Sequence, residues 1–397
     1  MQPAELFERA RALLPELLCW RRELHRRAEL GFQEHETSAY LAAMLRDMGI
    51  ALRTGVGGTG IIGVIGSGAP AIGLRGDMDA LPILEVSDAP YVSQHPGVMH
   101  ACGHDGNMTI VLGAARLLSE LPDRPAAEFR VLLQPSEENQ DAEGKSGAMR
   151  LLEEGALQGL DYVIGQHVHS DVPVGQVRIS PGYVMASADA FEATITGHGA
   201  HGAYPHQSVD PIFLLGQLIP AVQGIVARRI KPQEPAVVTI GAVHAGLAGN
   251  VIPERVTLAG TLRAYNPEVR QQLWDELERA FGVVRALGGD YTLKIHGGYP
   301  ATHNEAMVAE TIAAVAREMA GDAAVGAMEP SMGAEDFSLM TQAVPGAMFQ
   351  TGVALPGPLR PHHNERFDLD EAGLVLGVAV MAAAALRLAE RHGKGQG

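Results

Sequence analysis

AIGLRGDMD, residues 71–79, is the stretch of sequence that decides the fold. It is a short apolar segment followed directly by two carboxylates, Asp77 and Asp79. Similar apolar runs occur at 60–65, 129–134 and 162–166, and helical patterns separate most of them. Strands that alternate with helices predict an α/β layer with a mixed, mostly parallel sheet. Ligands of such sheets bind beyond the carboxyl ends of the strands, which is where both aspartates are expected.

The helices around this sheet are predicted from apolar periodicity. Their ranges are Glu5–Arg27, Glu36–Met48, a segment after His104, Ala148–Glu154, Met307–Met319 and Glu371–Arg391. A further strand is expected at 348–350. The longest apolar run, Leu374–Leu386, is too short to span a bilayer and is typical of a buried helix.

The middle of the chain has a different pattern. Alternation at 189–197 predicts a strand, followed by a helix at 211–229, strands at 236–244 and 255–265, a helix at 267–287 and a strand at 291–296. The order βαββαβ is that of a ferredoxin-like domain. Because α/β character resumes near residue 299, we expect this domain, residues 185–298, to be inserted into a discontinuous domain of residues 1–184 and 299–397.

Length and composition limit the function classes. A chain of 397 residues is expected to form two domains. Its formal net charge of -16 argues against a nucleic-acid surface and against attraction to anionic membranes. Only two cysteines occur, Cys19 in a helical pattern that predicts a core position and Cys102. No signal-peptide pattern is present near the first residue, so a cytoplasmic location is expected.

Cys102 and His104 place a thiol and an imidazole two residues apart, with His100 and Asp105 beside them. Such side chains point nearly opposite ways on a helix, but they can converge on an extended or looped backbone. Thiolate and imidazole are ligands of zinc and similar ions. A small buried cysteine beside surface histidines gives the same pattern, so the interpretation depends on the clusters that accompany it.

Further ligand-type residues follow later predicted strands. Glu137 and Glu138 come after the strand at 129–134. Because neighbours on an extended chain point opposite ways, one carboxylate can bind a metal while the other acts as a general base. His167 is expected to end the next strand, with His169 close behind, and Pro361-His362-His363 lies in a loop before the last helix. Each of these clusters alone also fits an ordinary surface role.

Counted together, the clusters offer five protein ligands, a number that suits a two-metal centre. The five are Cys102, His104, Glu138, His167 and His363. Asp79 is expected to hold a ligand imidazole from behind. Asp77 and Asp79 could instead belong to a solvent-exposed turn with no role at a metal site.

Eight motifs occur in an order that resembles one known family. They are HRRAELGFQEHET (25–37), RGDMDALP (75–82), HACGHDG (100–106), QPSEE (134–138), GHGAHGAYPH (197–206), GNVIPE (249–254), GTLRAYN (260–266) and EDF (335–337). They cover nearly the whole chain and resemble the M20 peptidase family. The resemblance is to its amidohydrolase branch, which includes hippurate hydrolases, N-acyl-amino-acid amidohydrolases and auxin-conjugate hydrolases.

The resemblance implies a metal-dependent exopeptidase-type catalytic domain with two divalent metal ions per subunit, held by the five ligands above. Zinc or manganese is expected, and cobalt or nickel fits the same ligand types. The resemblance also implies that Glu137 is the general base, that His201 binds the oxyanion, and that Asn250 and Arg263 lie near a substrate carboxylate. The inserted domain would be a lid and dimerisation domain, giving a homodimer or homotetramer in which His201 acts across subunits.

The sequence departs from the family pattern at several positions. Asn107 stands where the family has the last histidine of HDGH or HDAH, and Gln166 and His169 stand where apolar residues are common. Glu365 replaces the proline of the family's H-x-P-x-F/Y motif, which leaves His362 as an alternative to His363. The segment 139–146 is longer and more polar than the usual glycine-rich link.

The expected reaction is hydrolysis of the amide bond of an N-acyl or N-aroyl amino acid, such as hippurate, through a metal-activated water. The products would be a carboxylic acid and a free amino acid. One alternative is an aminopeptidase or a carbamoyl-amino-acid hydrolase of the same family. The other is a homologue that binds metal without hydrolysis, which Asn107 favours and the intact Glu137 argues against.

Overall fold

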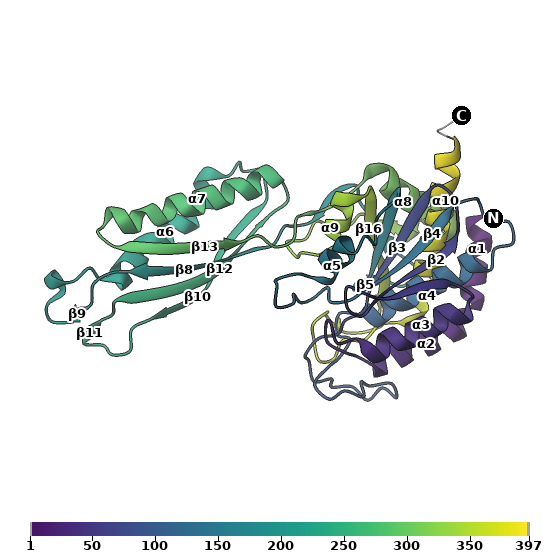
Figure 1. The fold of residues 1–397 in the computed structure, drawn as a ribbon, viewed down its shortest axis with the longest axis horizontal. Coiled ribbons are helices and arrows are strands. Elements are labelled where there is room, and N and C mark those ends of the chain that lie inside the picture. Colours follow the sequence, from purple (N-terminus) through teal and green to yellow (C-terminus); the bar gives the residue numbers. More distant parts are fainter. Residues whose placement is uncertain (1, 395–397) are drawn as a thin grey trace. The chain divides into compact units, whose positions relative to one another are not determined.

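The computed structural model describes residues 2–394, and they form two compact units. Unit 1 contains the described residues of Met1–Gly182, His303–Glu329 and Leu339–Gly397. Unit 2 contains Tyr183–Thr302 and Pro330–Ser338. Both are drawn in Figure 1.

Unit 1 is built on an eight-stranded sheet whose central strands β4, β3, β5 and β16 run parallel, as the sequence predicts. The order across the sheet is β1-β2-β4-β3-β5-β16-β6-β15, and β1 and β2 are antiparallel to their neighbours. The strands are β1 (Ala51–Val56), β2 (Gly60–Gly66), β3 (Ala71–Asp77), β4 (Glu128–Gln134), β5 (Tyr162–Pro173), β6 (Val177–Arg178), β15 (Val325–Gly326) and β16 (Gly346–Ala354).

The helices of unit 1 pack against this sheet and one another (Figure 1). They are α1 (Pro3–Ala12), α2 (Leu14–Arg26), α3 (His35–Asp47), α4 (His104–Ser119), α5 (Gly147–Glu153), α8 (Ala306–Ala320), α9 (Phe337–Ala343) and α10 (Leu374–Lys394), with short 3-10 turns at Asp322–Ala324 and Glu371–Gly373. The apolar helix α10 packs on α1, α4 and α8, and its residues 374–386 are buried, which confirms the predicted buried helix.

Unit 1 differs from the sequence prediction in several elements, which include the unpredicted β6, β15 and α9, and in the position of one residue. The single helix expected at Glu5–Arg27 is two helices that meet at Leu13, because Pro15 has no N–H for a continuous helix. Strand β1 was not predicted, since its residues are mostly exposed and form no apolar run. Strand β5 continues to Pro173, so His167 lies inside the strand instead of at its end. Cys19 is exposed, not in the core.

Unit 2 contains a four-stranded antiparallel sheet of order β10-β12-β8-β13. In chain order its main elements are β8 (Asp189–Thr196), α6 (Pro211–Arg229), β10 (Ala236–Ala245), β12 (Arg255–Ala264), α7 (Pro267–Ala286) and β13 (Asp290–His296), which is the order βαββαβ. Asn266 caps α7, because its side-chain oxygen accepts the Glu268 N–H at 2.8 Å. Short elements complete the chain: β7 (Gly182–Met185), β9 (Ala200–His201), Pro205–Gln207, β11 (Val251–Ile252) and β14 (Thr302–Asn304).

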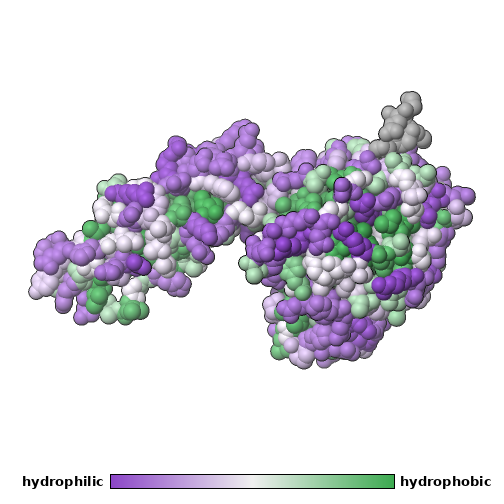
Figure 2. All heavy atoms as spheres, in the orientation of Figure 1, coloured by the Kyte–Doolittle hydropathy of each residue, from purple (hydrophilic) through white to green (hydrophobic). Residues whose placement is uncertain are grey.

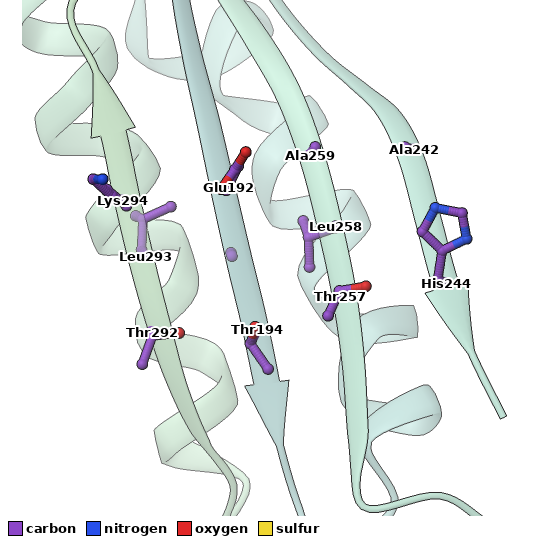
Figure 3. Close-up of a pocket in the computed structure, with 11 residues that line it drawn as sticks. Glu192, Thr194, Ala242, His244, Thr257, Leu258, Ala259, Thr292, Leu293 and Lys294 are labelled. Carbon is purple, nitrogen blue, oxygen red and sulfur yellow. The ribbon is translucent and has the colours of Figure 1, made fainter. Parts of the chain in front are cut away.

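The two faces of the unit 2 sheet are unlike each other. Phe191, Leu218 and Phe281 belong to a buried apolar cluster between the sheet and helices α6 and α7. The opposite face carries polar side chains such as Glu192 and Lys294 over a shallow hollow, with the helices behind the strands (Figure 3). Among the described residues that line this hollow, none is a predicted site residue.

Candidate metal centre

The loop before α4 brings Cys102 and His104 against strand β5. Gly103 makes this approach possible, since it has φ +89° and a Cβ there would lie 2.5 Å from a methyl carbon of Val168. The chain therefore turns tightly between the two predicted ligands, and helix α4 begins at His104. Sγ of Cys102 lies 3.5 Å from Nε2 of His167 on β5.

All five predicted ligands meet in unit 1. Three overlapping groups each bring one ligand-type atom per residue within 4.8 Å of the others. The groups are Cys102, His104 and His167; Cys102, Glu138 and His363; and His104, Glu137 and Glu138. Nε2 of His363 also lies 3.0 Å from a carboxylate oxygen of Glu138. Thiol, imidazole and carboxylate groups from four distant segments thus form overlapping groups that share Cys102, His104 and Glu138.

Asp79 organises the turn after β4. Its two carboxylate oxygens accept the backbone N–H groups of Glu137 and Glu138, each at 3.0 Å. Nδ1 of His104 lies 2.8 Å from the carbonyl oxygen of Asp79 and 3.3 Å from its carboxylate. The structure therefore places Asp79 against the His104 imidazole, and Asp79 also holds the backbone of both glutamates.

The donor set fits divalent cations. Nδ1 of His104 is held by Asp79, whereas within the described chain no group meets its buried Nε2 in hydrogen-bond geometry. A buried ring nitrogen is costly to leave without a partner, so a cation at this nitrogen resolves the cost. Burial raises the pKa of the Cys102 thiol to about 12, so its thiolate requires a compensating positive charge.

The structure distinguishes His362 from His363. Nδ1 of His362 lies 2.9 Å from the carbonyl oxygen of Cys102, and its Nε2 accepts the Ser170 N–H at 3.2 Å. Both ring nitrogens of His362 are therefore used by the backbone. His363 has φ +60°, an uncommon conformation for a residue with a side chain, and directs Nε2 toward Glu138. The geometry favours His363 as the ligand.

Sequence reasoning missed Glu34, a buried acid that supports the turn of Glu137. One carboxylate oxygen accepts the Ser136 N–H at 2.8 Å and the other accepts the Thr59 hydroxyl at 2.6 Å. Burial raises the pKa of Glu34 to about 7. The residue lies in the quoted motif at 25–37, but no spacing in that motif indicates a contact with a turn about a hundred residues later.

His201, Asn250 and Arg263 lie in unit 2, and the structure does not bring all three together. His201 pairs with Val251 in the β9–β11 ladder, and the Asn250 carbonyl accepts the Gly202 N–H at 2.8 Å, so the first two are neighbours. Arg263 lies near the other end of β12, eight residues beyond Arg255. At the rise of an extended strand this corresponds to roughly 26 Å.

The remaining departures from the family pattern have local partners. Nδ1 of His169 lies 2.7 Å from Asp171 and its Nε2 lies 3.0 Å from the amide nitrogen of Gln350. The Glu365 carbonyl accepts the Val86 N–H at 2.8 Å, which ties the loop of His363 to the segment after β3.

His100, the histidine next to the predicted ligands, is buried, and its ring lies 6.2 Å from that of His25. It does not belong to any of the three ligand groups.

An α/β fold that carries this ligand cluster on and beside its parallel strands is that of a metal-dependent hydrolase acting on amide bonds. The chain belongs to peptidase family M20/M25/M40, whose family model matches residues 73–387. This confirms the resemblance that the eight motifs indicated.

Three similar proteins illustrate the relationship. A protein named probable hydrolase from Synechocystis sp. is 38% identical over 96% of this chain and 98% of its own. N-acetyl-L-cysteine deacetylase of Bacillus subtilis is 37% identical over 95% of this chain and 89% of its own. A Bacillus subtilis crystal structure described as a dinuclear metal-binding peptidase of the M20 family is 32% identical, covers 96% and 99% of the two chains, and has a TM-score of 0.84.

Proposed function

We propose that this chain hydrolyses the amide bond of N-acyl or N-aroyl amino acids. The observation that carries the proposal is the position of Glu137, which is 8% exposed and lies in one group with His104 and Glu138. A carboxylate beside a ligand cluster is placed to act as a general base. The relative named as an N-acetyl-L-cysteine deacetylase supports an acylated amino acid as the substrate class.

Two divalent cations would be held by the five clustered ligands, Cys102, His104, Glu138, His167 and His363. When bound, they would supply Lewis acidity that lowers the pKa of a water molecule toward neutrality and polarises a carbonyl oxygen. The relative described as a dinuclear metal-binding peptidase supports this number. The thiol and imidazole ligands favour zinc, and manganese, cobalt or nickel suits the mixed set.

Glu137 carries the proton in the proposed reaction. Its carboxylate takes a proton from the water that attacks the amide carbon, and a C–O bond forms. The same carboxyl group then gives the proton to the leaving nitrogen as the C–N bond breaks. The products are a carboxylic acid and the free amino acid. The Asp79 hydrogen bond to the Glu137 N–H keeps the carboxylate beside the ligands during both transfers.

Unit 2 would supply the remaining groups. His201 would stabilise the negative charge that develops on the carbonyl oxygen. Arg263 is half-buried and would bind the free carboxylate of the substrate through paired hydrogen bonds, with Asn250 beside a substrate carboxylate. The length of β12 between Arg263 and the His201–Asn250 pair supports an arrangement in which His201 and Asn250 serve the neighbouring subunit.

We propose a homodimer or homotetramer through unit 2, which the same observation supports. Strand β10 is an edge of the unit 2 sheet, and an exposed edge readily pairs with a second chain. Exposed apolar side chains lie on α6, on the β10–β11 loop and on β11, and hydrophobic atoms are visible where unit 2 carries β11 (Figure 2). They include Ile212, Phe213, Ile219, Leu247 and Val251. We place the enzyme in the cytoplasm, in keeping with its two unpaired cysteines.

The test is a panel of N-acyl amino acids, including hippurate, offered to chelator-treated protein before and after it is reloaded with zinc or manganese. We expect release of amino acid only after reloading. Release from a peptide with a free amino terminus, or cleavage of a ureido group, would instead identify the aminopeptidase or carbamoyl hydrolase. Metal uptake without any release would identify a binding protein.

A further inference from the structure

Two departures from the family pattern, Asn107 and Gln166, touch each other in the structure. Nδ2 of Asn107 donates to a carboxylate oxygen of Asp77 at 2.8 Å. Its Oδ1 accepts two hydrogen bonds, from the Val168 N–H at 2.9 Å and from Nε2 of Gln166 at 3.1 Å. The Thr351 hydroxyl donates to Oε1 of Gln166 at 3.1 Å. All these groups are buried, so the chain of hydrogen bonds is shielded from water.

Asn107 connects three segments around the proposed ligands His104 and His167, namely α4, β3 and β5. It lies one turn beyond His104 on α4 and therefore on the same side of the helix. Its partner Asp77 ends β3 and lies 3.9 Å from Nδ1 of His104. Its partner Val168 is next to His167 on β5. One side chain thus links the helix that begins at His104 to the strand that contains His167.

We propose that Asn107 and Gln166 form a coupled pair of positioning residues that sets the spacing of the His104 and His167 imidazoles for metal binding. The proposal rests on the metal centre proposed above and concerns this chain's own solution to holding it. Neither amide touches the proposed ligand atoms. Their effect is transmitted through Asp77 and through the backbone of Val168.

Positions 107 and 166 are coupled because the number of hydrogen-bond acceptors at position 107 limits how many donors it can satisfy. The amide oxygen of Asn107 has two lone pairs and uses both, one for Val168 and one for Gln166. A neutral histidine at position 107 that donates to Asp77 has a single acceptor nitrogen left. It would leave either the Val168 N–H or the Gln166 amide without a partner in the interior. An apolar residue at position 166 has no amide that needs an acceptor. A histidine at position 107 is therefore expected to be tolerated best when residue 166 is apolar.

The experiment compares Asn107→His, Gln166→Leu and the double variant with the wild type. Each protein is stripped with a chelator, and its Zn²⁺ affinity is measured by competition with a chromophoric chelator. The absorption spectrum of the Co²⁺ form reports the ligand geometry. We expect each single variant to bind Zn²⁺ 10–100-fold more weakly, the usual effect of losing an outer-shell partner, with a shifted Co²⁺ spectrum. The double variant should recover most of the affinity.

A control distinguishes positioning from general loosening of the fold. Asn304 is another buried asparagine of unit 1, which binds both backbone groups of Met348, at 2.8 and 2.9 Å. Asn304→His should lower the free energy of unfolding of the metal-free protein and leave Zn²⁺ affinity unchanged. A milder variant, Thr351→Val, removes only the hydroxyl above Gln166. It should weaken Zn²⁺ binding in the wild type and have no effect when residue 166 is leucine.

The pairing is wrong if the two single-variant losses simply add in the double variant, or if the single variants bind Zn²⁺ as tightly as the wild type. A wild-type protein that binds no metal would overturn the metal centre itself. Because metal affinity is measured apart from turnover, the failure of the pair and the failure of the proposed function give different results.

Discussion

Glu137 and Glu138 are neighbours in the chain, and we propose different roles for them. Glu138 is paired with His363 at 3.0 Å, and against the opposing effect of burial this partner holds the pKa of Glu138 below its usual range. Glu138 is therefore an ionised ligand candidate. Asp79 holds the backbone N–H groups of both glutamates, and Glu137 is buried beside His104 and Glu138. The contacts of Asp79 hold the backbone of both residues in the turn, as the proposed division of roles requires.

Glu137→Gln should leave metal content near the wild-type level while the turnover number falls about 10²–10⁴-fold, because the amide keeps the shape and loses the base. Metal analysis of the purified variant and initial rates on hippurate measure the two effects. Glu138→Gln is the matched control, since it should lose metal as well as activity. Substantial activity in Glu137→Gln would refute the general-base assignment.

Glu34 predicts a pH-dependence of stability. Its pKa is about 7 in the folded protein, against 4.5 for an ordinary glutamate, so the folded state binds the proton more tightly. The free energy of unfolding should therefore fall as pH rises from about 4.5 to 7, by at most about 3 kcal/mol. Glu34→Gln should remove this part of the fall. Urea denaturation between pH 5 and 8 measures it, and identical profiles for both proteins would contradict the account.

The sequence allowed the candidate ligands to be predicted from their side-chain chemistry, but not the contacts that these residues make. Cys102, His104, Glu138, His167 and His363 were identified because their side chains suit metal ions and follow strands or loops. The preference for His363 over His362 could not be derived, because it depends on backbone groups of Cys102 and Ser170, far away in the chain. The role of Glu34 was hidden for the same reason.

At the scale of elements, the connection from β4 to α5 is the most constrained part of the site. Ser136 has φ +40°, and its carbonyl accepts the Gly147 N–H at 2.9 Å. A Cβ on Gly147 would lie 1.6 Å from the carbonyl oxygen of Pro135, which leaves no room for any side chain. The long polar segment 139–146 therefore has to return the chain to a glycine beneath the turn of Glu137.

Gly147→Ala should lower the free energy of unfolding by about 3 kcal/mol, because the clash is with backbone that cannot rotate away. Turnover should fall with it, since the turn also carries Glu137. Gly282→Ala on α7 is the control, because its Cβ meets nothing within 4 Å. It should be neutral or stabilising by about 0.5–1 kcal/mol. Equal denaturation midpoints for the two variants would contradict this description of the turn.

Helix and strand positions followed from periodicity wherever one face of the element is buried. Helix α6 occupies the predicted range 211–229, and β3 begins at residue 71 as expected. The failures have physical causes. Strand β1 is exposed and has no apolar pattern, and the helix at the start of the chain breaks before Pro15. Strand β5 continues past His167 because β16 pairs with it along most of its length.

At the scale of the whole molecule, the proposed site draws on residues that one chain keeps apart. His201 and Asn250 lie beyond one end of β12, and Arg263 lies near the other. The order of the motifs along the sequence does not reveal this separation. The motifs that contain Asn250 and Arg263 are close in sequence, but they lie at opposite ends of β12. In the proposed dimer, a second subunit would supply His201, so that all three could serve one substrate.

Mixing two inactive variants tests this arrangement. Homodimers of His201→Ala and of Glu137→Gln should each be nearly inactive. After subunit exchange, the mixture should regain about a quarter of wild-type activity, since half of the reassorted dimers are mixed and one of their two sites is complete. Rates on hippurate before and after exchange measure the gain. No recovery in a mixture shown to contain mixed dimers would mean that His201 acts within its own chain.

The central claim is that side chains from residue 102 to residue 363 form one metal centre. Its most direct test is calorimetric titration of chelator-stripped wild-type protein with Zn²⁺, beside the variant Cys102→Ser. We expect about two tightly bound ions per wild-type chain, as in a two-metal hydrolase, and weaker binding with altered stoichiometry in the variant. Absence of tight binding in the wild type, or binding that Cys102→Ser leaves unchanged, would contradict the account.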